Sequence, residues 1–139
     1  MSPEELSTIH HKCFVQPRPW TPEEFRAILK KNILLFKSKS FLLGREISGE
    51  AEILTLAVSP SERRVGLASF LITEFIIKMK QIKAERIILE VDQNNKPALN
   101  LYKNFSFKKI SERKAYYQPN LNTFSSNAFL LEHKVFYEH

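Results

Sequence analysis

Glycine and cysteine are scarce in this chain of 139 residues, and long apolar runs are absent. Cys13 is its one cysteine, which excludes an internal disulfide and favours a reducing compartment. The opening stretch, MSPEELSTIHHKCF, is acidic and then polar, unlike a secretory leader. No apolar run reaches about 18 residues, the length that a membrane-spanning helix requires. We therefore expect a cytoplasmic protein with no membrane contact.

Two common phosphate-binding motifs are also missing. The chain contains neither GxxxxGK[ST] nor GxGxxG, which excludes a Walker loop and a dinucleotide fingerprint. Metal chemistry is not expected, because His10 and His11 are adjacent on an expected helix and diverge by about 100°. Cys13 has no nearby base other than these histidines, so a covalent route through its thiol is disfavoured.

The positive charge is concentrated in one part of the chain. The formal net charge is +6, and residues 78–114 hold ten basic and four acidic side chains, so the rest is balanced. This half could bind nucleic acid, an anionic cofactor or a ribosomal surface, or it could be a solvated lysine-rich surface.

The order of the expected elements indicates one domain, residues 1–139, with a mixed α/β (α+β) sheet and helices on both faces. Ser2 with Glu5, Thr21 and Asn95 have the spacing of helix N-caps. A strand, a helix and a second strand in the middle predict a parallel pair with a right-handed crossover, and the last two strands are expected to be antiparallel. The expected helices are 2–14, 22–31, 67–79 and 95–105, and the expected strands are 33–38, 40–47, 50–60, 86–93, 107–118 and 125–139.

The turn in AVSPSERRVGLASFL, residues 57–71, joins a strand to a helix through Gly66. The first amides of a helix lack intrahelical acceptors, so they can bind phosphate. Gly66 would let a ligand approach the backbone, and Arg63 and Arg64 add positive charge. The residues alone leave two readings open, an ordinary turn and an anion site.

A second group of polar residues lies in RIILEVDQNNKPALNLYKNF, residues 86–105. Strand alternation places Glu90 on the face opposite Leu89 and Val91, where it is either exposed or partly buried for proton transfer. Asn95 and Tyr102 are seven residues apart, which puts them on one helix face about 10 Å apart. Tyr102 could also be an ordinary core residue with its hydroxyl in water.

Together these motifs resemble the GNAT acetyltransferase superfamily, and within it the bacterial ribosomal-protein-alanine N-acetyltransferase (RimI) type. Arg-Arg-Val-Gly-Leu-Ala, residues 63–68, is similar to the R/Q-x-x-G-x-G/A signature. The second part of the resemblance is carried by Leu89-Glu90-Val91, Asn95, Ala98-Leu99-Asn100-Leu101-Tyr102 and Phe105-Ser106-Phe107. The likeness runs from about Leu6 to Leu131.

The resemblance implies acetyl-CoA as the acetyl donor and no metal. It implies Glu90 as general base and Tyr102 as general acid, with direct attack of the amine in a ternary complex. The acceptor implied is the N-terminal alanine or serine of a protein such as a small-subunit ribosomal protein, which would lie near Tyr116 and Tyr117. No direct nucleic-acid binding is implied. The coenzyme-binding positions implied are Leu56, Ala57, Val58, Arg64, Val65, Gly66, Leu67, Ala68, Ser69 and Asn95.

The chain departs from the family pattern in three places. No residues precede the first expected helix to form the usual first strand, so either an edge strand is missing or the true start lies upstream. Asn127 replaces a usual acidic residue, which affects the expectation on peptide selectivity, and Ser106 replaces a usual glycine.

Two other functions share the same coenzyme motif. One is acetylation of a small amine or a lysine side chain. The other is a non-catalytic CoA-binding or ribosome-docking module, which the basic half suggests, although the presence of both Glu90 and Tyr102 argues against lost catalysis.

Overall fold

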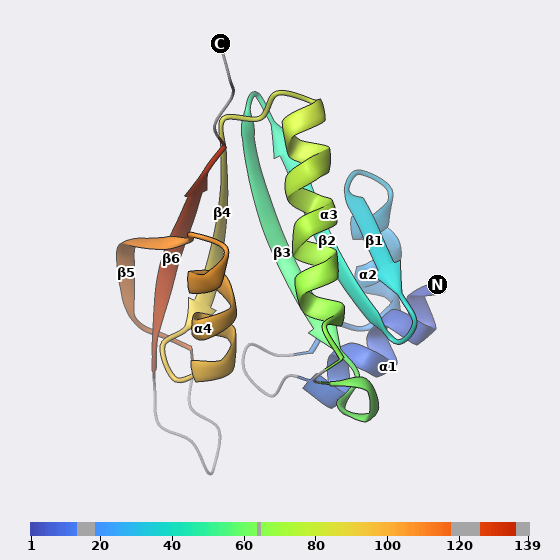
Figure 1. Ribbon diagram of the computed structural model, residues 1–139. Coiled ribbons are helices and arrows are strands. Elements are labelled where there is room, and N and C mark those ends of the chain that lie inside the picture. The colour runs from blue at the N-terminus through green and yellow to red at the C-terminus, as the bar shows by residue number, and fades with distance from the viewer. Residues whose placement is uncertain (14–18, 64, 118–125, 136–139) are drawn as a thin grey trace.

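The structure is a computed structural model that describes residues 1–13, 19–63, 65–117 and 126–135, with side chains omitted at 115–117. Figure 1 shows one sheet with helices on both faces. In chain order the elements are α1 (Pro3–Cys13), α2 (Pro22–Leu29), β1 (Ile33–Lys37), β2 (Ser40–Ile47), β3 (Glu50–Val58), a short 3-10 turn (Pro60–Glu62), α3 (Leu67–Gln81), β4 (Arg86–Asp92), α4 (Lys96–Asn104), β5 (Lys108–Tyr117) and β6 (Ser126–Lys134).

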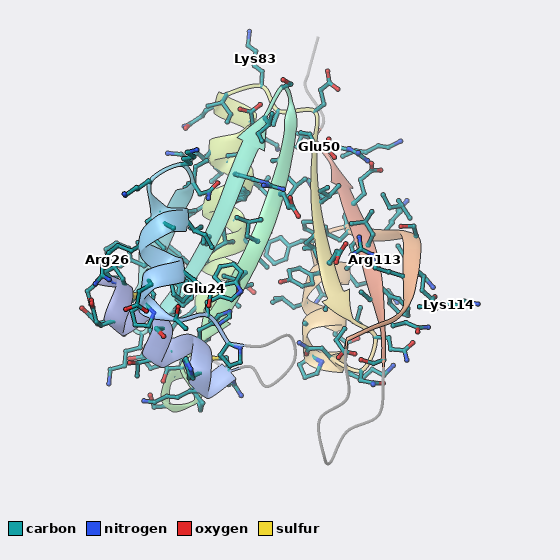
Figure 2. All side chains as sticks on the ribbon, turned by 180° about the vertical axis from the view of Figure 1, so that it is seen from behind. Glu24, Arg26, Glu50, Lys83, Arg113 and Lys114 are labelled. Carbon is teal, nitrogen blue, oxygen red and sulfur yellow. The ribbon has the colours of Figure 1, made fainter. Side chains whose placement is uncertain are left out.

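The sheet has the strand order β1-β2-β3-β4-β6-β5. Only β3 and β4 are parallel, and α3 connects them across one face of the sheet. The other neighbouring pairs are antiparallel. α3 and α4 lie on one face, and α1 and α2 lie on the opposite face (Figures 1 and 2). The expected mixed sheet with helices on both faces is confirmed.

Local capping explains where the first two helices begin. The Ser2 hydroxyl accepts a hydrogen bond from the Glu5 amide at 3.1 Å, and the Glu5 carboxylate accepts one from the Ser2 amide at 3.3 Å. Thr21 and Glu24 form the same reciprocal capping box at the start of α2. These bonds satisfy amides that have no partner within the helix, so the positions of both N-termini follow from sequence.

Two apolar clusters hold the layers together. On the α3 face, Phe75 and Leu71 pack with Ile87 and Leu89 of β4. A Cβ on Gly44 of β2 would come within 2.7 Å of the Phe75 ring, so glycine lets this ring lie directly on the sheet. The second cluster lies on the α1 face and is made by Leu6, Ile9, Phe25, Phe41, Leu43 and Ala57.

The first strand of the family pattern has no counterpart among the described residues, because Met1 and Ser2 precede α1 without forming a strand. On that side the sheet ends at β1. Within the described ranges, no helix is both long and apolar enough to cross a membrane.

Ser106, which stands where the family usually has glycine, has a φ of 64°. An L-residue in this left-handed region costs about 1 kcal/mol relative to glycine. We therefore expect Ser106→Gly to raise the free energy of unfolding by about 1 kcal/mol, measured by chemical denaturation.

The control is Ser111→Gly in strand β5, where the backbone does not have a positive φ. Glycine inside a strand adds only conformational freedom to the unfolded chain, so this variant should lose stability by about 0.5–1 kcal/mol. Equal shifts in both variants would contradict backbone strain at Ser106.

Candidate active site

The site begins where β3 and β4 separate. Their pairing covers only Glu50–Arg86, Ala51–Ile87 and Glu52–Ile88. Directly beyond this point β3 carries an irregularity, because its partners on β2 shift so that Leu54 is an extra residue between Ile53 and Thr55. Such a bulge bends a strand and increases its twist. The remaining halves of β3 and β4 therefore leave space between them.

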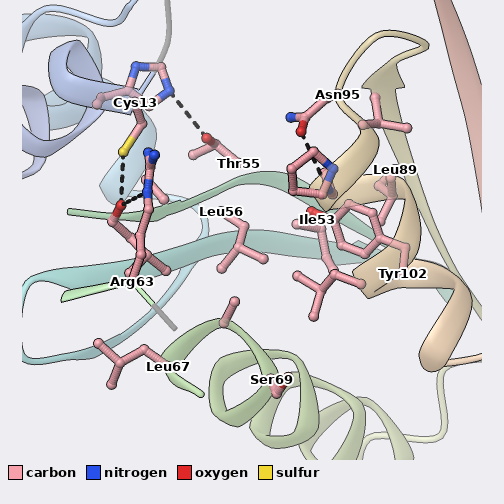
Figure 3. A pocket seen from close by; sticks show the side chains of 18 of the residues that line it. Cys13, Ile53, Thr55, Leu56, Arg63, Leu67, Ser69, Leu89, Asn95 and Tyr102 are labelled. Atoms are coloured by element: carbon pink, nitrogen blue, oxygen red, sulfur yellow. Dashed lines mark hydrogen bonds between the residues drawn. The ribbon is translucent and has the colours of Figure 1, made fainter. Parts of the chain in front are cut away.

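The bulge also changes which side chains face which helices. Ile53 and Leu56 pack in the cluster on the α3 face, whereas Leu54 and Ala57 pack in the cluster on the α1 face. Thr55 faces α1, where its hydroxyl contacts His10. Figure 3 shows Thr55 on the α1 side of the strand and Leu56 on the α3 side. One strand thus supplies an apolar wall to the α3 face and, on the α1 face, a wall that contains the polar side chain of Thr55.

The space between the strands is a cavity of about 870 Å³. Its lining comes from β3, β4, the starts of α3 and α4, and α1, so that it extends past both faces of the sheet. A volume of this size accommodates an extended small molecule.

Gly66 and the first turn of α3 form one end of the cavity. Gly66 has a φ of 81°, and a Cβ placed on it would meet no heavy atom within 4 Å. The first bond of the helix runs from the Phe70 amide to the Gly66 carbonyl at 3.0 Å. The amides of Leu67, Ala68 and Ser69 precede this bond and are available to an anion. The open space therefore lies beside a helix N-terminus.

Tyr102 lies on α4 and is 7% exposed. Burial alone raises the pKa of its phenol well above the ordinary value of 10. Its ring contacts Phe107 edge-on at 5.5 Å between centroids, and it reaches the cavity beside Ile53 and Leu89 (Figure 3). The phenol is therefore neutral at any working pH, with a proton available to a group in the cavity.

Glu90 lines the same cavity from β4. Its side chain is 29% exposed, and one carboxylate oxygen lies 3.1 Å from a guanidinium nitrogen of Arg113 on β5. Of the two settings left open by the sequence, the exposed one is observed for the residue as a whole. Arg113 points along the face that α1 and α2 leave uncovered over β4 and β6 (Figure 2). The ion pair thus orients the carboxylate on the side opposite α3.

The backbone carbonyl at the end of β3 accepts hydrogen bonds from two side chains. The Val58 oxygen accepts hydrogen bonds from the Cys13 thiol and from Nε of Arg63, both at 3.2 Å. The turn that follows β3 is anchored to the β1–β2 hairpin by Glu62, which accepts a hydrogen bond from the Ser38 hydroxyl at 2.6 Å. Cys13 is therefore engaged in a structural contact between α1 and β3.

Asn95 caps α4, with its side-chain oxygen accepting from the Ala98 amide at 3.2 Å. The residue lies at the cavity, where its amide nitrogen remains a possible donor. Asn127, which replaces an acidic residue of the family pattern, donates a hydrogen bond to the Glu112 carboxylate. An aspartate there would place two carboxylates together, so the substitution is compatible with Glu112.

The cavity brings together most of the residues that the sequence singled out. Val65 is not among the residues that line the cavity and is 70% exposed. Arg64, and the side chains of Tyr116 and Tyr117 on β5, lie outside the described residues. Ten predicted residues line the cavity: Leu56, Ala57, Val58, Gly66, Leu67, Ala68, Ser69, Glu90, Asn95 and Tyr102.

Sequence reasoning missed the wall that α1 contributes. His10 and Trp20 line the cavity, and the Trp20 amide donates a hydrogen bond to Nδ1 of His10 at 2.9 Å. Nε2 of His10 lies 3.2 Å from the Thr55 hydroxyl. The only available signal was a histidine on an otherwise apolar helix face, which does not reveal its partner 45 residues away.

Comparison with known proteins places the chain in a family. The sequence profile of the acetyltransferase (GNAT) family matches residues 5–107. The chain belongs to the GNAT acetyltransferase family. In a search of solved structures, this GNAT chain superposes on the ribosomal-protein-S18-alanine N-acetyltransferase of Escherichia coli with a TM-score of 0.85 and 20% identity, covering 99% of this chain and 90% of that one.

Two curated relatives extend the comparison. An N-alpha-acetyltransferase of Sulfurisphaera tokodaii is 35% identical over 49% of this GNAT chain and 41% of its own length, so the match spans less than half of that relative. A Bacillus subtilis protein, provisionally named a [ribosomal protein bS18]-alanine N-acetyltransferase, is 31% identical over 73% of each chain. Arabidopsis thaliana NAA60, solved with acetyl-CoA, superposes with a TM-score of 0.76 and 21% identity, covering 96% of this chain and 93% of that one.

The buried imidazole of His10 predicts how the stability of the fold depends on pH. Burial, and next the charge of His11, lower the pKa of His10 to about 4, against a smaller opposing effect of Glu24. Above pH 6.5 the imidazole is neutral in both folded and unfolded chains. As the pH falls from 6.5 to 4, only the unfolded chain takes up the proton, so stability is lost over this window, by up to about 3 kcal/mol.

The measurement is urea denaturation from pH 7 to pH 4. His10→Gln removes the titrating group, so its stability should fall less steeply than that of the unmodified protein over this range. His11→Gln, one residue along the same helix, is the control and should keep most of the steep fall, because burial, the largest cause of the lowered pKa of His10, remains. A His10→Gln curve parallel to that of the unmodified protein would refute the assignment.

Proposed function

We propose that this chain transfers the acetyl group of acetyl-CoA to the α-amine at a protein N-terminus, with alanine or serine first and a ribosomal protein as one possible acceptor. The observation that carries the proposal is the cavity, because it combines an anion-binding helix start, a carboxylate and a buried phenol. The names of the relatives from Sulfurisphaera tokodaii and Escherichia coli support an α-amine acceptor.

The residues at the α3 end fit the coenzyme. Its pyrophosphate would lie against the amides of Leu67, Ala68 and Ser69, where the open space beside Gly66 admits it. The extended pantetheine arm would follow the part of β3 that has no β4 partner, between Leu56 and Val58. The thioester would then reach the region between β3 and β4 beside Tyr102.

The two candidate catalytic groups have complementary protonation states. An α-ammonium has a pKa of about 8, so a carboxylate acting directly or through water can take its proton. Glu90, oriented by Arg113, would do this on the α1 face. The amine nitrogen then forms a bond to the thioester carbon and releases its second proton to water. The carbon–sulfur bond breaks, and the Tyr102 phenol gives its proton to the departing thiolate.

The acceptor would enter on the face opposite α3. Over β4 and β6 this face has no covering helix in the described part of the chain, which leaves room for a peptide (Figure 2). Tyr116 and Tyr117 follow Arg113 on β5 and remain candidates for contact with the acceptor.

The function is tested by incubating the protein with acetyl-CoA and peptides that differ only in their first residue. Acetylation is located by mass spectrometry. We expect the acetyl group on the α-amine of peptides that begin with alanine or serine. Peptides with a blocked N-terminus and an internal lysine serve as the matched control.

Three results would redirect the proposal. Acetylation of the internal lysine alone would indicate a lysine acetyltransferase, and acetylation of polyamines alone would indicate a small-amine enzyme. Coenzyme binding without any transfer would favour a non-catalytic binding module.

Tyr102→Phe tests the general acid. The change removes only the hydroxyl, so the core around Leu89 and Phe107 stays packed. We expect kcat to fall about 10²–10⁴-fold, because protonation of the leaving group is lost. The dissociation constant for acetyl-CoA, measured by calorimetry, should change little.

Tyr116→Phe is the comparison variant, since Tyr116 is the next candidate for the acid. If Tyr116→Phe lowered kcat and Tyr102→Phe left it unchanged, the acid role would move to Tyr116. A Tyr102→Phe variant with weakened coenzyme binding and unchanged kcat would assign Tyr102 to binding.

A further inference from the structure

The wall of the cavity on the α1 face contains a directed chain of hydrogen bonds. It runs from the Trp20 amide to Nδ1 of His10, at 2.9 Å, and from Nε2 of His10 to the Thr55 hydroxyl, at 3.2 Å. His10 is 2% exposed and is enclosed by the rings of Trp20, Phe25 and Phe41. The imidazole therefore has little freedom to rotate.

The direction of each bond follows from chemistry. A backbone amide can only donate, so Nδ1 of His10 must carry a lone pair. Burial lowers the pKa of His10 to about 4, so the ring is neutral near pH 7 and holds its one proton on Nε2. Nε2 therefore donates to Thr55, and the Thr55 oxygen accepts.

Thr55 is thereby left with a proton to donate. A hydroxyl that accepts one hydrogen bond still carries its own O–H. In the described part of the chain, His10 is the partner recorded for this hydroxyl, and Thr55 lines the cavity. This series of hydrogen bonds therefore ends at the Thr55 hydroxyl, which is oriented to donate a hydrogen bond at the edge of the cavity.

Glu90 lies across the gap from this donor and on the same face of the sheet. The alternation of β4 places Leu89 and Val91 in the α3 cluster and Glu90 on the other face, whereas the bulge turns Thr55 toward α1. An amine between the two walls would meet an acceptor on one side and a donor on the other. In a peptide N-terminus the first carbonyl oxygen is only three bonds from the amine nitrogen.

We propose that Thr55 is a positioning residue that donates a hydrogen bond to the first carbonyl oxygen of the acceptor peptide. The inference rests on the proposed function and deepens it. The contact selects amines that carry a carbonyl group on the neighbouring carbon, and it disfavours lysine side chains and simple amines, which have no such oxygen. Trp20 and His10 act through Thr55, by holding its hydroxyl in the donating orientation.

The test pairs two proteins with two acceptors. The acceptors are a peptide that begins with alanine and the same peptide with its first amide replaced by an (E)-alkene, which keeps the shape and removes the oxygen. The proteins are the unmodified chain and Thr55→Val, which keeps the shape and removes the hydroxyl. We expect Thr55→Val to lower kcat/KM about tenfold for the peptide and to leave the alkene analogue unchanged.

Two further variants separate positioning from packing. Thr55→Ser restores the hydroxyl and should recover most of the loss. If Thr55→Val unfolds because Nε2 of His10 loses its hydrogen-bond acceptor, Thr55→Cys takes its place in the test. A thiol still accepts weakly but is a poor donor, so this variant should also lose activity mainly on the peptide. Melting temperature and the acetyl-CoA dissociation constant are measured for each.

An equal loss on the peptide and the alkene analogue would overturn the inference and leave the proposed function intact. So would a Thr55→Val protein that discriminates the two acceptors as well as the unmodified chain does. If the unmodified chain acetylated no peptide α-amine, the proposed function would fail, and this inference would fail with it.

Discussion

The separation of β3 from β4 is the constraint on which the rest of the site depends. Parallel pairing stops at Glu52 and Ile88, and the extra residue Leu54 follows at once on β3. If the two strands stayed paired to their ends, the sheet would be continuous and the cavity of about 870 Å³ would not exist. Beyond Glu52, β3 has no hydrogen-bonded partner on its β4 side within the residues that the structure describes. The unpaired backbone N–H and C=O groups on that side form a surface for an extended ligand.

The same separation divides the chemistry between two faces. The α3 face holds the helix start at Gly66 and the buried phenol of Tyr102, whereas the α1 face holds Glu90 and Thr55. Under the proposed function, the donor and acceptor substrates would approach from opposite sides, meet between the strands and be bound at once with little overlap between their sites.

Features that depend on neighbours in sequence were predictable. The capping box of Ser2 with Glu5 and the N-cap at Thr21 formed as expected, because each depends on residues a fixed few positions apart. The strand alternation around Glu90 also held, because every second side chain of a strand faces the same way.

Features that depend on register were not predictable in the same way. Nothing in the alternation of EAEILTLAV, residues 50–58, marks Leu54 as the extra residue. The Glu90–Arg113 pair requires β5 to lie two strands from β4, with β6 between them. The contact of His10 with Trp20 depends on how the start of α2 packs against α1. Each of these is set by long-range packing.

The open stretch of β3 has a consequence for how the protein behaves among other proteins. Unpaired strand edges are ordinarily templates for intermolecular pairing and aggregation. Here the unpaired groups lie inside the cavity, flanked by α3, α4 and α1, rather than on the rim of the sheet. The fold can therefore keep a strand edge permanently available to a slender ligand without offering it to the broad edge of another sheet.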